Sequence, residues 1–78
     1  MKDVFQDVVD FLGNYSEIDP KTVEPGTRLK EDLGLSSLTL IMMVEQAERK
    51  FGISIRDDQL ITLRSVGDIV KCVEAQQR

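Results

Sequence analysis

In three separate segments, the apolar residues of this chain recur at the spacing of an α-helix, which restricts the fold more than any other feature. The first segment, residues 3–14, ends at a Gly-Asn pair that suits a helix C-terminus. Its apolar face comprises Val4, Phe5, Val8, Phe11 and Leu12. The second segment runs from Ser37 to Phe51, and Gly52 follows it as a good C′ residue. The pattern predicts two amphipathic helices here.

The third segment follows Ser65, and Asp68 lies three residues further on, a variant of the capping box. Its apolar residues are Val66, Ile69, Val70 and Val73. We predict a short helix or turn at residues 57–61. Ile53 and Ile55 alternate as in a strand, but no partner strand is evident. We therefore predict an all-α fold, a small four-helix bundle with three long helices and one short one.

A long connection, residues 15–36, separates the first two helices and contains Pro20, Pro25 and Gly26. Its apolar residues could pin it to a core: Ile18, Val23, Leu29 and Leu33. We therefore expect an ordered loop. With only 78 residues, the chain is expected to form a single domain over residues 1–78.

Charge and cysteine content exclude several classes of protein. The 14 acidic and 10 basic residues give a net charge of −4, which argues against nucleic-acid binding. Cys72 is the only cysteine and histidine is absent, so neither an internal disulfide nor a zinc site is expected. No apolar run is long enough to span a membrane, and the acidic N-terminus is unlike a signal peptide. We expect a cytoplasmic monomer.

Catalysis by this chain alone is not expected. Without histidine, Ser-His and Cys-His nucleophile pairs cannot form. The carboxylate pairs Glu31-Asp32 and Asp57-Asp58 adjoin basic or polar residues in predicted loops, where solvated surface charge is the simpler interpretation. The sequence also lacks a glycine-rich phosphate loop. The prediction is a protein that is not an enzyme.

Two serines, Ser36 and Ser37, stand where the second helix begins. A serine at this position can accept a hydrogen bond from a free N–H group of the first turn. The same N–H groups and the helix dipole favour an anion, so a phosphodiester on either serine would lie in a favourable field. Both interpretations, cap and modification site, are open at this point.

The chain resembles the acyl carrier protein family over nearly its whole length. The family pattern Asp-Leu-Gly-x-Asp-Ser-Leu entering a helix is matched here by DLGLSSL, residues 32–38. The family's Thr-Val-Gly-Asp before the last helix is matched by SVGD, residues 65–68. The motif also stands at the correct distance from both flanking helices.

The resemblance implies that Ser37 carries 4′-phosphopantetheine, with Ser36 as the alternative site. It further implies that a phosphopantetheinyl transferase attaches this group from coenzyme A with Mg²⁺. Acyl-loading and acyl-processing enzymes of fatty acid, polyketide or related biosynthesis would then use the group's thiol to hold acyl intermediates. The alternatives are a peptidyl or aminoacyl carrier, and an unmodified carrier-like adaptor that binds partner proteins.

The sequence departs from the family pattern in two ways. Ser36 replaces the family's Asp before the modified serine, which motivates the adaptor alternative. The second helix is acidic in typical members, but here residues 38–51 hold two acids and two bases. We therefore expect partner recognition to involve an exposed apolar pair beside the arm together with the nearby charges. The residues predicted for recognition are Leu38, Met42, Glu45, Glu48 and Arg49.

The remaining apolar residues of the second helix fall on one broad arc at 100° per residue. The core is predicted to receive Leu40, Ile41, Met43, Val44, Ala47 and Phe51. An acyl pocket is predicted to be lined by Leu40, Met43, Ala47, Ile61 and Leu63. Small Ala47 would leave room for a chain in this pocket.

Overall fold

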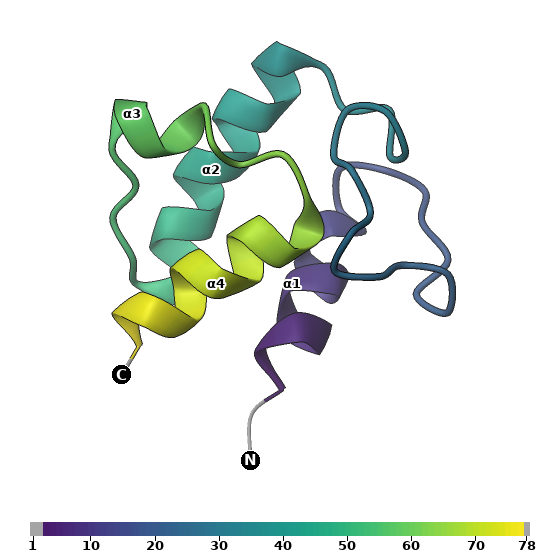
Figure 1. The fold of residues 1–78 in the computed structure, drawn as a ribbon, viewed down its shortest axis with the longest axis horizontal. Helices are drawn as coiled ribbons and strands as arrows, with labels where there is room; N and C mark the ends of the chain where they lie inside the picture. The colour runs from purple at the N-terminus through teal and green to yellow at the C-terminus, as the bar shows by residue number, and fades with distance from the viewer. Residues whose placement is uncertain (1–2, 78) are drawn as a thin grey trace.

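A computed structural model describes residues 3–77, which form four helices and contain no β-strand (Figure 1). The helices are α1 (Val4–Leu12), α2 (Ser37–Phe51), α3 (Asp57–Leu60) and α4 (Val66–Gln76). The prediction of a small all-α bundle with three long helices and one short one is confirmed. None of these helices is long and apolar enough to cross a membrane.

The helix ends follow the capping rules that the sequence indicated. Gly52 ends α2 in the left-handed conformation with a φ of 67°. Ser65 and Asp68 form the predicted capping box, in which each side chain accepts from the other residue's backbone N–H. At the start of α1, the Asp3 side chain accepts from the Gln6 N–H at 3.2 Å.

The core receives the apolar faces of the three long helices, and α1 packs against α4. The Phe11 ring meets Tyr15 and Phe51 edge-on, with ring centroids 5.3 Å and 5.7 Å away. The buried apolar residues are Val8, Val9, Phe11, Leu12, Val23, Leu29, Leu35, Met43, Val44, Ala47, Ile53, Val66, Ile69 and Val73. This core holds residues from the three long helices, the long connection and the start of the segment after α2, whereas residues 57–65, which include α3, bury none.

The long connection is ordered, as expected, and lies beside α1 (Figure 1). Its buried side chains are Val23, Leu29 and Leu35, and its half-buried ones include Ile18 and Leu33. Backbone hydrogen bonds tie it to the start of α4, because the Leu29 N–H donates to the Arg64 carbonyl and the Val66 N–H donates to the Thr27 carbonyl, both at 2.9 Å. These bonds place the residues just before α2 firmly against the bundle.

The connection between α2 and α3 is tied by side chains to the neighbouring helices. The Glu48 carboxylate accepts from the Ile55 N–H at 3.0 Å. Gln76 of α4 accepts from the Ser54 N–H at 2.8 Å and donates to the Ser54 carbonyl at 2.6 Å. Short helix α3 therefore depends on these contacts for its position beside α2, since it has no buried side chain of its own.

Candidate functional site

The segment that enters α2 is fixed by local backbone geometry. Gly34 has a φ of 71°, a conformation that costs little only for glycine. On either side of it, Leu35 is buried and the Leu33 carbonyl accepts from the Ser16 hydroxyl at 2.9 Å. The Leu35 N–H donates to the Leu29 carbonyl at 3.1 Å. The family-like motif is thus an anchored turn that presents the first residues of α2 at the surface.

The two adjacent serines have different environments. Ser36 is the N-cap of α2, and its hydroxyl oxygen accepts from the Thr39 N–H at 3.2 Å. The same hydroxyl donates to the Thr39 Oγ1 at 2.9 Å. Serine is as good an N-cap as aspartate, so the substitution in the motif removes a charge but keeps the cap.

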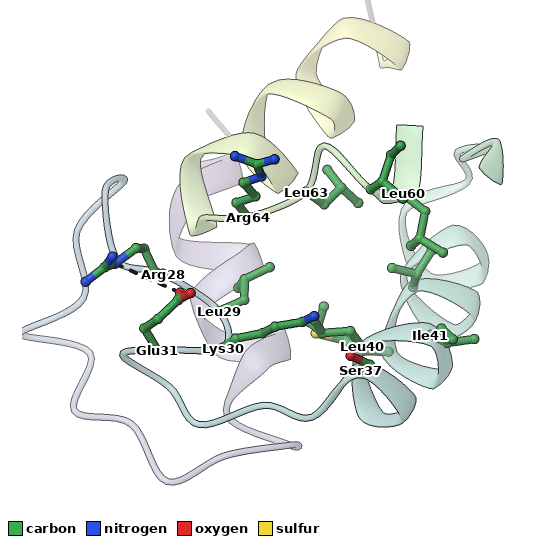
Figure 2. Close-up of a pocket in the computed structure, with 13 residues that line it drawn as sticks. Arg28, Leu29, Lys30, Glu31, Ser37, Leu40, Ile41, Leu60, Leu63 and Arg64 are labelled. Carbon is green, nitrogen blue, oxygen red and sulfur yellow. Dashed lines mark ion pairs between the residues drawn. The ribbon is translucent and has the colours of Figure 1, made fainter. Parts of the chain in front are cut away.

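Ser37 is the first residue of α2, and its side chain is exposed. Within residues 3–77, no hydrogen bond engages its hydroxyl. Figure 2 shows this hydroxyl at the end of α2, on the edge of a cavity that Ser37 helps to line. A primary hydroxyl that is exposed and uncommitted in this way is accessible to an external enzyme.

The first turn of α2 suits an attached anion. It contains no acidic residue, and only the Thr39 N–H is occupied by the side-chain cap. The Leu40 N–H donates to the Ser36 carbonyl at 2.9 Å, so the Ser37 and Leu38 N–H groups remain without intrahelical partners, at the positive end of the helix dipole. A phosphodiester linked to the Ser37 oxygen fits this environment, because its negative charge would lie at the positive end of the helix dipole and no acidic side chain of the first turn would repel it.

A cavity of about 630 Å³ lies between the start of α2, the segment around α3 and the loop before α2 (Figure 2). Its apolar lining is Leu29, Leu40, Ile41, Met43, Val44, Leu60, Ile61 and Leu63. Its polar lining is Arg28, Lys30, Glu31, Ser37 and Arg64. This volume is in the range of pockets that hold small organic ligands.

Four of the five residues predicted for an acyl pocket line this cavity, namely Leu40, Met43, Ile61 and Leu63. Ala47 does not line it, because it is packed in the core with 2% of its surface exposed. Leu29 also lines the cavity and was missed by the sequence analysis. Its contribution depends on the folded path of the long loop, for which the sequence offers no periodic signal.

The exposed face of α2 is more apolar than predicted. Leu38 and Met42 are 68% and 55% exposed, as the prediction of an exposed pair requires. The prediction that Ile41 belongs to the core is wrong, because this residue is 46% exposed and lines the cavity. The helical spacing correctly placed Ile41 on the inner side of α2. At this position, however, α2 faces an open cavity and not a packed helix or loop.

The charged residues predicted for recognition differ in their exposure and in their hydrogen bonds. Glu45 and Arg49 are exposed on α2. Glu48 is half-buried, and its hydrogen bond to the Ile55 N–H gives it a structural role. A substitution of Glu48 would therefore disturb the connection to α3 as well as any partner contact.

The carboxylate pairs form local contacts at the surface. Arg28 lies 4.0 Å from Glu31 and 3.7 Å from Asp32, and Arg56 lies 3.3 Å from Asp58. Within residues 3–77, no group of three metal-ligating side chains is placed to hold an ion. The thiol of Cys72 is half-buried on α4. Both carboxylate pairs are exposed, as the interpretation of solvated charges requires, but Asp57 and Asp58 lie in the first turn of α3 and not in a loop.

Comparisons with known proteins identify the family of this chain. Residues 6–73 match the family described as the phosphopantetheine attachment site. The acyl carrier protein of Aster yellows witches'-broom phytoplasma (strain AYWB) is 39% identical over 67 residues, which is 86% of this chain and 88% of the relative. The acyl carrier protein of Sulfurovum sp. (strain NBC37-1) is 35% identical over 71 residues, covering 91% of this chain and 95% of the relative.

The fold agrees as well. A solved structure of an acyl carrier protein from Enterococcus faecalis superimposes with a TM-score of 0.81 at 26% identity, covering 92% of this chain and 91% of that one. The chain therefore belongs to the acyl carrier protein family. It is a carrier and not an enzyme, and it acts with biosynthetic enzymes. The family match and the relatives indicate 4′-phosphopantetheine as its covalently attached group.

Proposed function

We propose that Ser37 is the residue that carries 4′-phosphopantetheine and that Ser36 serves as the cap of α2. One observation carries this assignment: the Ser36 hydroxyl is engaged with Thr39, whereas the Ser37 hydroxyl is exposed and without a partner among residues 3–77. The cap that Ser36 retains supports modification over the adaptor alternative, because the entry to α2 keeps its geometry without the usual carboxylate.

The cavity beside Ser37 has the properties needed to shelter an acyl chain. When bound, the phosphopantetheine group supplies a terminal thiol that holds an acyl group as a thioester. Leu40 and Met43 present apolar surface from α2, and Leu63 presents it from the far side of the cavity. This chain's contribution is to exclude water from the acyl group while leaving the Ser37 end open to enzymes.

The expected partners are a phosphopantetheinyl transferase, which uses coenzyme A and Mg²⁺, and the acyl-loading and acyl-processing enzymes of fatty acid, polyketide or related biosynthesis. Leu38, Met42, Glu45 and Arg49 are placed on the exposed face of α2, where such enzymes would approach Ser37. The setting that we propose is the cytoplasm, with residues 1–78 acting as a single monomeric carrier domain.

The assignment is tested by locating the modification. The purified apo protein is incubated with coenzyme A, Mg²⁺ and a broad-specificity transferase, and the peptide that contains both serines is fragmented in a mass spectrometer. We expect one phosphopantetheine on Ser37 and none on Ser36. Modification on Ser36 would overturn the assignment, and an unmodified peptide would do the same if the protein isolated from its own host were also unmodified.

A further inference from the structure

The lining of the cavity beside Ser37 contains more cations than acids. Its charged side chains are Arg28, Lys30, Arg64 and a single acid, Glu31. The Arg28 Nε lies 4.0 Å from a carboxylate oxygen of Glu31, so these two charges are paired. Within residues 3–77, Lys30 and Arg64 form no ion pair. The cavity therefore has unpaired positive charge, although the chain as a whole has a net charge of −4.

Of the two unpaired cations, Lys30 is the one that faces Ser37. In Figure 2, the Lys30 side chain extends from the loop across the cavity toward the end of α2 that holds Ser37. The guanidinium of Arg64 lies toward α4, on the other side of the cavity from Ser37 (Figure 2). Lys30 is exposed, so its apolar stem can lie along the cavity mouth while its ammonium group stays in water.

Backbone hydrogen bonds in the turn before α2 keep Lys30 close to this helix end. The Gly34 N–H donates to the Lys30 carbonyl at 3.1 Å. The Leu35 N–H donates to the Leu29 carbonyl at the same distance. Ser37 follows Leu35 by only two residues, a separation of about 7 Å at most. A flexible four-carbon lysine stem can reach an anion on Ser37 from this position.

The exposed acids of α2 and α3 do not supply a partner for Lys30. Glu45 lies about two turns beyond Ser37, a rise of about 12 Å along α2. Asp58 lies 3.3 Å from Arg56, with which it is paired. Glu45, Asp57 and Asp58 are all exposed, and none of them lines the cavity. These acids give α2 and α3 a mixed surface, but they leave the ammonium group beside Ser37 uncompensated.

The anion that suits this place is the phosphate of the attached group. The phosphate is bonded directly to the serine oxygen, whereas the thiol, and any acyl group on it, is at the other end of the arm. A carboxylate on the acyl group would therefore lie far along the arm from Lys30. Lysine binds phosphate as a compact point charge, which needs no fixed geometry.

We propose that Lys30 pairs with the phosphodiester of phosphopantetheine on Ser37. The ammonium group from the loop and the free Ser37 and Leu38 N–H groups of α2 then act on the same negative charge. Because Lys30 lines the cavity, this pair also directs the start of the arm toward the apolar lining. Lys30 is thus a cofactor-binding residue outside the serine motif. The inference rests on the proposed function of Ser37.

The first test compares the apo and modified forms of the full chain by urea unfolding at low salt. Modification is expected to lower the unfolding equilibrium constant of the wild type about twofold to fivefold more than that of Lys30→Gln, the range of an exposed charge pair. Lys50→Gln removes the same charge at the far end of α2 and should keep the wild-type effect. Lys30→Arg should also keep it, because the charge remains.

Salt gives a further check on the same samples. Raising NaCl from about 0.05 M to about 0.5 M is expected to reduce the difference between the wild type and Lys30→Gln, because an exposed charge pair is screened. Circular dichroism confirms the fold of each variant.

The second test observes the contact directly by NMR in the folded chain. On modification of the wild type, the ¹³Cε signal of Lys30 is expected to shift and that of Lys50 to stay in place. The ³¹P signal of the phosphodiester should differ between the wild type and Lys30→Gln, whereas Lys50→Gln should match the wild type. These signals report the contact even where a variant changes the stability of the fold.

The outcomes separate this inference from the function on which it rests. If Ser37 is modified but Lys30→Gln and Lys50→Gln give the same change in stability and the same ³¹P signal, the ion pair is wrong and the carrier function stands. A Lys30 ¹³Cε signal that does not move on modification would equally overturn the pair. Modification on Ser36 would instead contradict the proposed function, and this inference would fail with it.

Discussion

The two sides of this small bundle differ in how completely their apolar side chains are buried. On the side of α1 and α4, the apolar residues are buried and the long loop is joined to the start of α4 by backbone hydrogen bonds. On the side of α2 and α3, a cavity of about 630 Å³ opens beside Ser37. The large hydrophobic residues that are exposed within residues 3–77 all lie in α2 or directly after α3, and two of them, Ile41 and Ile61, line the cavity. The second side also contributes Met43, Val44 and Ala47 to the core, but it differs from the first in that it holds an open cavity and exposed apolar side chains.

The largest expected difference between the sides is the cost of removing an apolar side chain. Leu12→Ala in α1 is expected to lower the free energy of unfolding by about 2–5 kcal/mol, because Leu12 is fully buried and its loss leaves a cavity. Ile61→Ala should cost less than about 0.5 kcal/mol, because Ile61 is 75% exposed. Urea unfolding measures both. Equal costs would mean that the residue that ends α3 packs as closely as α1, contrary to the comparison.

A second test concerns the close contact between the long loop and α4. A Cβ on Gly67 would stand 2.9 Å from the Pro25 carbonyl oxygen, to which the Gly67 N–H donates at 2.8 Å. Gly67→Ala is therefore expected to cost about 1–3 kcal/mol, because the backbone of the loop must move. Gly26→Ala is the control, since nothing lies within 4 Å of its added Cβ. A neutral Gly67→Ala would show that the loop is not held firmly to α4.

The smallest expected effect is a pH dependence at the start of α4. Burial raises the pKa of the Asp68 carboxyl, but hydrogen bonds from Arg64 and Ser65 and the charge of Lys71 outweigh burial and leave this pKa below its ordinary value of 3.8. A carboxyl with a lowered folded pKa stabilises the fold above the unfolded pKa and loses this contribution as pH falls through the folded one. Stability from Asp68 should therefore be full at neutral pH and decline below pH 3.8.

Asp68→Asn is expected to lower the free energy of unfolding by about 0.5–1 kcal/mol at pH 7, with a smaller difference from wild type in acid. Glu74→Gln, an exposed substitution in the same helix, is the control. Urea unfolding at several pH values gives the difference between variant and wild type. A difference that stays constant or grows in acid would show that the Asp68 charge contributes nothing to the cap.

The fold was largely predictable because its signals are local. The bounds of α2, the capping box of Ser65 and the C-terminal Gly52 follow from periodicity and backbone preference over a few residues. The order of the long loop was also predictable from its apolar residues, but not its contacts. The hydrogen bonds that join it to α4 link backbone groups far apart in the chain, and these have no signature in the side chains.

The sequence predicted the two serines of the site better than it predicted the surroundings of Ile41 and Glu48. The motif identified the two serines, but only the geometry assigned the cap to one and left the hydroxyl of the other exposed. Helical periodicity gave the direction of Ile41 without showing that the opposite space is open. It also could not show that Glu48 is engaged with the Ile55 N–H, since that contact depends on the path of the chain after α2.

The central claim is that the adjacent serines have separate roles, and measuring both roles on the same samples tests it most directly. Ser36→Ala and Ser37→Ala are each exposed to transferase, coenzyme A and Mg²⁺ for intact mass, and unfolded in urea. We predict that Ser36→Ala loses about 1 kcal/mol of stability and still gains phosphopantetheine, whereas Ser37→Ala keeps its stability and gains nothing. If Ser37→Ala were modified while Ser36→Ala were not, the assignment of the two serines would be contradicted.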